Sequence, residues 1–148
     1  MKYTSKQVQI YQKEQAIYEV LSCFSNFTPI LADKVEEWEA TDDRCSFKAQ
    51  GFKIGLKMDE KIPYNTIKVV DDDGASPIPF AFWIQLKEVG ENDTRMRIVL
   101  DVELNMMMKA ILGGKLQDAV DKIAEQVATA FNTRPETILN TPGTPYVN

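Results

Sequence analysis

The side chains that could carry out chemistry in this sequence are few, and histidine is absent from all 148 residues. This absence excludes Ser-His and Cys-His nucleophile systems, histidine metal ligands and the general base most often used near neutral pH. Tyr64, Asp101, Asn105 and Lys109 are the polar residues closest to the apolar segments, so they are the candidates for steering a proton transfer. The pattern assigns none of them to an interior.

The acidic groups do not indicate acid-base or metal chemistry. The pairs Glu36/Glu37 and Asp101/Glu103 fall on predicted solvent faces, where nothing would shift their pKa values. The run Asp71-Asp72-Asp73-Gly74 resembles the start of a calcium loop, but Phe82 stands where that loop requires glutamate at its twelfth position. We therefore predict a solvated turn, no metal and no cofactor.

Charge and cysteine content limit the partners and the compartment. Lys and Arg total 17 against 22 Asp and Glu, a net charge of -5, so nucleic acid is not an expected partner. Cys23 and Cys45 form no CxxC motif and are predicted to be reduced core thiols. No apolar run approaches the roughly 18 residues of a membrane span, and the N-terminus has no apolar signal segment. We expect a cytoplasmic protein without integral membrane contact.

These residues must be positioned by a predicted order of strand, two short helices, six strands and one long helix. Residues 3–11 alternate around Val8 and Ile10, which predicts a first strand. An apolar stripe within residues 13–27 predicts an amphipathic helix. Thr28 as a cap and Pro29 as the first helical residue predict a second, short helix.

From residue 34 to residue 105 the apolar period is two, with a polar turn at Thr41–Arg44 that predicts a hairpin. Alternation is cleanest over residues 94–104, and it is typical of antiparallel sheet with one buried face. Asn105 is a predicted N-cap for a helix of about 26 residues, long enough at roughly 39 Å to cross a sheet. We expect one α+β domain over residues 1–132 and an irregular tail over 133–148.

This order of elements resembles the helix-grip layout of the START and polyketide-cyclase-like superfamily, SRPBCC. The resemblance is carried by AIYEVLSCFSNFTPIL (16–31), PIPFAFWIQLKEVGENDTRMRIVLDVELN (77–105) and MKAILGGKLQDAVDKIAEQVATAF (108–131). It implies a curved antiparallel sheet of about seven strands wrapped around the C-terminal helix, with an apolar molecule held between them. The superfamily's hydroxylase branch uses metal-binding histidines, which this chain lacks.

The inward positions of the strands and of the long helix are almost entirely apolar, which suits a lipid-like or polyketide-like ligand. The same side chains could instead meet in a filled core, because interiors are close-packed. The resemblance favours the cavity. The predicted ligand-binding residues are Phe52, Ile54, Leu56, Met58, Ile67, Val69, Phe80, Phe82, Ile98, Leu100, Val102, Met108, Leu112 and Leu116.

The start of the long helix combines Met106, Met107 and Met108 with Gly113 and Gly114. Each glycine costs a helix about 1 kcal/mol relative to alanine, so the pair needs a reason. One interpretation is close approach to a strand or ligand, or a gate whose flexible methionines accept varied apolar shapes. The alternative is a frayed first turn with ordinary surface exposure.

Three functional hypotheses follow. The one we favour is non-catalytic binding or transport of a small apolar molecule. A second is a cyclase-type enzyme, which would need a polar residue inside the pocket. A third is a protein-interaction module that uses the outer sheet face, where Trp83 indicates a homodimer contact, a register slip near Pro77 or Pro79, or cover from the tail.

Overall fold

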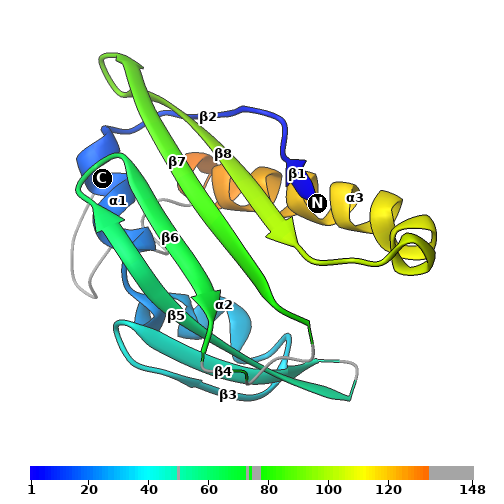
Figure 1. Cartoon of the computed structure of the whole chain (residues 1–148). Helices are drawn as coiled ribbons and strands as arrows, with labels where there is room; N and C mark the ends of the chain where they lie inside the picture. Colours follow the sequence, from blue (N-terminus) through cyan, green and yellow to red (C-terminus); the bar gives the residue numbers. More distant parts are fainter. Residues whose placement is uncertain (50, 73, 75–77, 134–148) are drawn as a thin grey trace.

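The computed structural model describes residues 1–49, 51–72, 74 and 78–133, which form an α+β fold (Figure 1). The strands are β1 (Lys2–Thr4), β2 (Val8–Ile10), β3 (Glu36–Ala40), β4 (Arg44–Ala49), β5 (Phe52–Ile62), β6 (Thr66–Asp71), β7 (Phe80–Gly90) and β8 (Asp93–Val102). The helices are α1 (Glu14–Leu21), a 3-10 turn (Phe24–Phe27), α2 (Thr28–Leu31) and α3 (Met106–Thr133). The predicted tail and the predicted turn at Asp73 and residues 75–77 lie outside the described residues.

All strands belong to one curved antiparallel sheet in the order β1-β8-β7-β6-β5-β4-β3, with β2 also paired to β8 (Figure 1). The sheet has eight strands where about seven were predicted, because the N-terminal strand is split in two. At the split, the Ser5 N–H donates to the Ile98 carbonyl at 2.8 Å and Ser5 Oγ accepts from the Ile98 N–H at 2.9 Å. The predicted helix-grip fold is confirmed.

The helical segment after β2 is less regular than its apolar stripe predicted. Helix α1 ends at Leu21, and the chain continues through the 3-10 turn into the four-residue α2. Thr28 is not the cap of α2, since Phe27 occupies that position. The Thr28 hydroxyl instead accepts a hydrogen bond from Trp38 Nε1 at 2.8 Å and so ties α2 to β3.

The long helix α3 begins where the sequence predicted. Asn105 Oδ1 accepts the Met108 N–H at 2.8 Å, which satisfies one of the free donors of the first turn. The helix lies along β1, β2 and β8 on the same side of the sheet as α1 (Figure 1). It therefore covers mainly the part of the concave face that β1, β2 and β8 form. The part formed by β3 to β7 is covered less by this helix.

The core sits where α1 and the second half of α3 meet the sheet. From α3 it takes Val120, Ala124, Ala128 and Phe131, all buried. From the sheet and α1 it takes Ile10, Ile17, Leu21, Ile67, Leu86, Met96 and Ile98. Because every one of these α3 residues lies after residue 119, the first half of the helix contributes no fully buried side chain among the described residues.

Candidate functional site

A row of apolar side chains crosses the concave face from one edge strand toward the middle of the sheet. The strand register pairs Tyr3 with Leu100, Leu100 with Phe82, Phe82 with Val69, and Val69 with Met58. Residues paired in this way project from the same face of an antiparallel sheet. The five side chains therefore form one continuous strip, whose members on β1 and β8 lie on the strands that α3 contacts.

Most of this strip is only partly covered. Tyr3, Leu56, Met58, Phe80, Phe82 and Leu100 are all half-buried and lie on the same side of the sheet, so we call them the half-covered face. The next row along, Ile98, Ile84 and Ile67, adjoins the α1 side, where Ile67 is completely buried. On β7 and β8, Phe82 and Leu100 are thus less buried than Leu86 and Met96, whereas Val69 and Val102 on the same face are buried.

The first turns of α3 and the rest of the helix are held differently. From Gln117 onward, Gln117 Nε2 donates to the Thr4 carbonyl at 2.9 Å and Asp121 Oδ1 accepts the Lys6 N–H at 2.6 Å. The hydrogen bond from the Lys6 N–H is the main reason why the pKa of the Asp121 carboxyl lies below its ordinary value. Glu125 pairs with the Lys6 ammonium, and Asn132 Nδ2 donates to the Gln9 carbonyl at 2.8 Å.

The first half of α3 presents apolar side chains to solvent. Met106 is 89% exposed, Met107 72% and Ile111 61%. Met108, Leu112 and Leu116 are half-buried. The first turns of α3 therefore carry an exposed apolar surface.

The two helix glycines differ in their surroundings. A Cβ on Gly113 would stand 3.3 Å from the Tyr3 hydroxyl, whereas a Cβ on Gly114 would meet nothing within 4 Å. Gly113 therefore lets the backbone of α3 approach β1, one of the reasons proposed from the sequence. Gly114 has no such packing reason in the described part of the chain.

The predicted ligand-binding residues fall into three groups. Ile67, Val69, Ile98 and Val102 are buried, and nine others are half-buried: Ile54, Leu56, Met58, Phe80, Phe82, Leu100, Met108, Leu112 and Leu116. Phe52 is 58% exposed at the start of β5 and contributes no cover to the interior. Tyr3, which belongs to the half-covered face, was not predicted, because the alternation around Val8 and Ile10 would turn it outward.

The polar candidates for proton transfer lie away from the half-covered face. Asp101 is on the outer face, where its carboxylate pairs with the Met1 amino group at 3.4 Å. Asn105 caps α3 and Lys109 is exposed. Tyr64 is also exposed, and its ring contacts Tyr18 edge-on at a centroid distance of 5.6 Å. The structure therefore does not bring these groups together.

The acidic turn and the cysteines have structural partners. Arg44 Nη1 donates to Asp72 Oδ1 at 2.7 Å, and the Cys23 thiol donates to Asp42 Oδ1 at 3.1 Å. Cys45 is buried, and both cysteines are free thiols. Within the described residues, no group of three or more Cys, Asp or Glu is placed to hold a metal ion.

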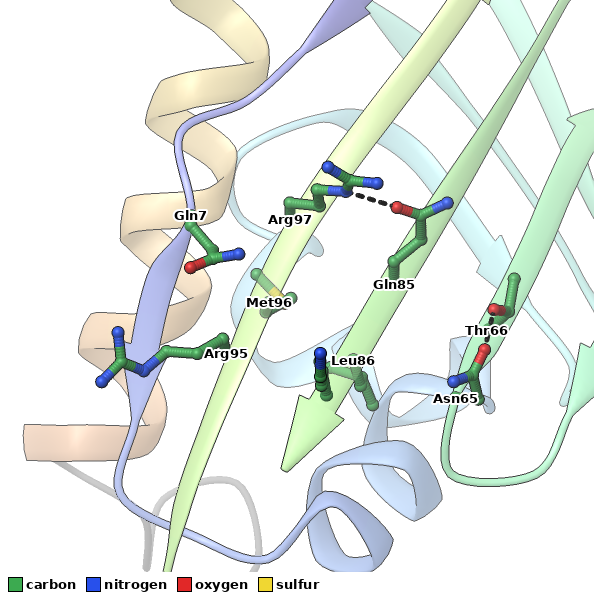
Figure 2. A pocket seen from close by; sticks show the side chains of 9 residues that line it. Gln7, Asn65, Thr66, Gln85, Leu86, Arg95, Met96 and Arg97 are labelled. Carbon is green, nitrogen blue, oxygen red and sulfur yellow. Dashed lines mark hydrogen bonds between the residues drawn. The ribbon is translucent and has the colours of Figure 1, made fainter. Parts of the chain in front are cut away.

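The outer face of the sheet is polar and carries Trp83, as the alternation predicted. The Trp83 ring is half-buried, with the Lys68 ammonium 5.6 Å and the Lys2 ammonium 5.9 Å from its centroid. Further along this face lies an open hollow of about 500 Å³. Its lining includes Gln85 and Arg97, whose Nε donates to Gln85 Oε1 at 2.5 Å (Figure 2). This hollow has a polar rim and is not the predicted apolar pocket.

The fold is that of START-like, or SRPBCC-like, proteins. A START superfamily protein from Mycobacterium smegmatis has a TM-score of 0.58 and 14% identity, covering 85% of this chain and 98% of that chain. Norcoclaurine synthase from Thalictrum flavum, solved as a point mutant with a transition-state analogue, has a TM-score of 0.62 and 13% identity, covering 85% and 96%.

A third similar structure is that of the Aha1 dimer from Colwellia psychrerythraea, with a TM-score of 0.62 and 13% identity over 89% of this chain and 96% of that chain. No protein-family model matches the sequence, and no curated protein matches it. Likeness at these identities establishes the fold alone. Among the described residues, no helix is both long enough and apolar enough to span a bilayer.

Proposed function

We propose that this protein binds a small apolar molecule, lipid-like or polyketide-like, between the half-covered face and the first half of α3, without transforming it. The observation that carries the proposal is the partial exposure of the half-covered face. Tyr3, Leu100, Phe82 and Met58 are only half-buried, whereas core residues such as Ile67 and Leu86 are buried. Partly exposed aromatic and aliphatic side chains on a concave face gain about 25 cal/mol for each Å² that a ligand covers.

Binding is favoured over catalysis because the strip offers a ligand almost no reactive group. Its members Leu100, Phe82, Val69 and Met58 have no titratable side chain, and Tyr3 supplies a single hydroxyl. A cyclase-type enzyme would need an acid and a base within hydrogen-bond reach of the substrate. The polar residues considered for that role, Asp101, Asn105 and Lys109, face elsewhere. A cytoplasmic location and a homodimer stay predictions from the sequence.

The proposal is tested by filling the proposed site. Leu100→Trp adds bulk on the half-covered face, so it should abolish uptake of a fluorescent fatty-acid probe while costing less than about 1 kcal/mol of unfolding free energy, because the proposal requires unfilled space beside Leu100. The matched variant Leu86→Trp places the same bulk in the closed core and should cost about 1 to 3 kcal/mol or more. Val99→Trp, on the outer face of the same strand, should leave uptake unchanged.

Native mass spectrometry of the freshly purified chain provides a second readout, in which a bound small molecule supports the proposal. Wild-type protein that carries no small molecule and takes up no fatty probe would overturn it. So would Leu100→Trp and Leu86→Trp destabilising the fold equally, because that result would mean that the half-covered face is closed in solution.

A further inference from the structure

In the described part of the chain, one buried side-chain oxygen or nitrogen has no hydrogen-bond partner, and it is the Tyr3 hydroxyl. Leaving such a group unpaired away from water is costly, and buried tyrosine hydroxyls normally find a partner. Phenylalanine would pack the same ring without this cost. The hydroxyl is therefore better explained by a partner that arrives from outside the chain than by packing.

The position of the hydroxyl indicates where that partner would lie. Tyr3 is paired with Leu100 and so projects from the half-covered face, and its oxygen lies under Gly113 of α3. The weakly anchored first turns of α3 adjoin this point. A ligand on the half-covered face that reached under α3 would bring its end within reach of the Tyr3 oxygen.

The surroundings of the hydroxyl also restrict the chemistry of the partner. The row that contains it, from Tyr3 through Leu100, Phe82 and Val69 to Met58, has no charged side chain. Lys2 and Asp101, the charged neighbours along β1 and β8, project from the outer face. Asp71, which the register places on this same face opposite Leu56, lies three strands away from Tyr3. A carboxylate or ammonium beside the Tyr3 hydroxyl would therefore lose its water without gaining a counter-ion there, which disfavours it strongly.

We propose that the ligand is an apolar molecule with one neutral oxygen group, an alcohol or a ketone, and that Tyr3 Oη is the hydrogen-bonding contact that fixes its orientation. A phenolic hydroxyl can donate to a carbonyl and can accept from an alcohol. This inference rests on the proposed function and adds the polarity of the ligand and the residue that recognises it.

The test uses 2-naphthol and 2-methylnaphthalene, which share a ring system and differ by a hydroxyl in place of a methyl group of similar size. Equilibrium dialysis measures the affinity of each probe for wild-type and Tyr3→Phe protein. We expect Tyr3→Phe to weaken the binding of 2-naphthol about tenfold, because one buried hydrogen bond is lost. The affinity for 2-methylnaphthalene should be unchanged. The variant should fold, because it removes only the unpaired oxygen.

Gly113→Ala gives an independent check, since its Cβ would crowd the Tyr3 oxygen at 3.3 Å. It should weaken the binding of 2-naphthol and leave that of 2-methylnaphthalene unchanged. Gly114→Ala, whose Cβ would meet nothing within 4 Å, should change neither affinity. An equal effect of Tyr3→Phe on both probes, or none on 2-naphthol, would overturn the inference while leaving the proposed function intact. If 2-methylnaphthalene binds to neither protein, the proposed function fails and the inference fails with it.

Discussion

Cys45 is a thiol that the fold holds in its protonated form. It lies in β4 opposite Leu56, and burial, assisted by the negative charge of Asp72, raises its pKa from 9.0 to about 12. A nucleophilic cysteine needs the opposite, a lowered pKa in an electropositive site. The environment of Cys45 therefore excludes it as a nucleophile near neutral pH and gives it a packing role.

This raised pKa predicts a loss of stability in alkaline solution. The unfolded chain releases the Cys45 proton near pH 9, but the folded chain keeps it until about pH 12, so between these values a rising pH favours unfolding. Relative to Cys45→Ala, the wild-type unfolding free energy should fall by up to about 1.4 kcal/mol per pH unit in this window. Urea unfolding of both proteins at about pH 8 and about pH 10 measures the difference. A constant difference would contradict the assignment.

Single residues mark the limit of what alternation could predict. Tyr3 was missed because the strand splits at Ser5, which shifts the inward positions from Val8 and Ile10 to Tyr3. Phe52 was assigned inward correctly by phase, yet it lies at the end of its strand, where little covers it. Neither fact can be read from apolar spacing, because one depends on the split of the strand at Ser5 and the other on the position of neighbouring elements.

Among the elements, α3 was the most predictable. Its apolar spacing is long and regular, and its cap at Asn105 is formed by a local hydrogen bond that needs no tertiary context. The hairpin at Thr41–Arg44 was predicted for the same reason, and it closes through the Thr41 N–H bond to the Arg44 carbonyl at 2.7 Å. The differing attachment of the two halves of α3 could not be foreseen, since it depends on its partners in β1 and β2.

The glycine pair in α3 gives a matched comparison at the scale of this element. Gly114→Ala should raise the unfolding free energy by about 1 kcal/mol through helix propensity. Gly113→Ala gains the same propensity but must displace the Tyr3 hydroxyl, 3.3 Å from the new Cβ, so it should gain clearly less. Chemical denaturation of the two variants beside the wild type measures both changes. Equal gains would show that α3 does not approach Tyr3 in solution.

At the scale of the whole molecule, the fold has a closed end and an open end. The closed end contains α1 and the buried face of α3 from Val120 to Phe131. The open end contains the half-covered face and the exposed Met106, Met107 and Ile111. The sequence could not distinguish the two ends, because the strands carry equally apolar inward faces throughout and only the placement of the helices determines which part is covered.

This division predicts two levels of amide hydrogen-exchange protection within one continuous helix. Amides from Val120 to Phe131 should exchange only through global unfolding, because buried contacts hold them. Amides from Met108 to Leu116 should exchange faster through local opening, and saturating 2-methylnaphthalene should slow them. Exchange monitored by NMR resolves the two segments. Uniform protection along α3, unchanged by the probe, would contradict a site at the open end.

The pairing of β1 and β2 with β8 has a consequence for the newly made chain. Lys2 in β1 pairs with Asp101 in β8, so β1, the first strand to be synthesised, can pair only after β8, the last strand, has been made. At about 5 to 20 residues per second, that wait is roughly 5 to 20 s. During this interval the nascent sheet has an unpaired edge and an uncovered apolar surface. A chain stalled before β8 would therefore be a substrate for chaperones or proteases.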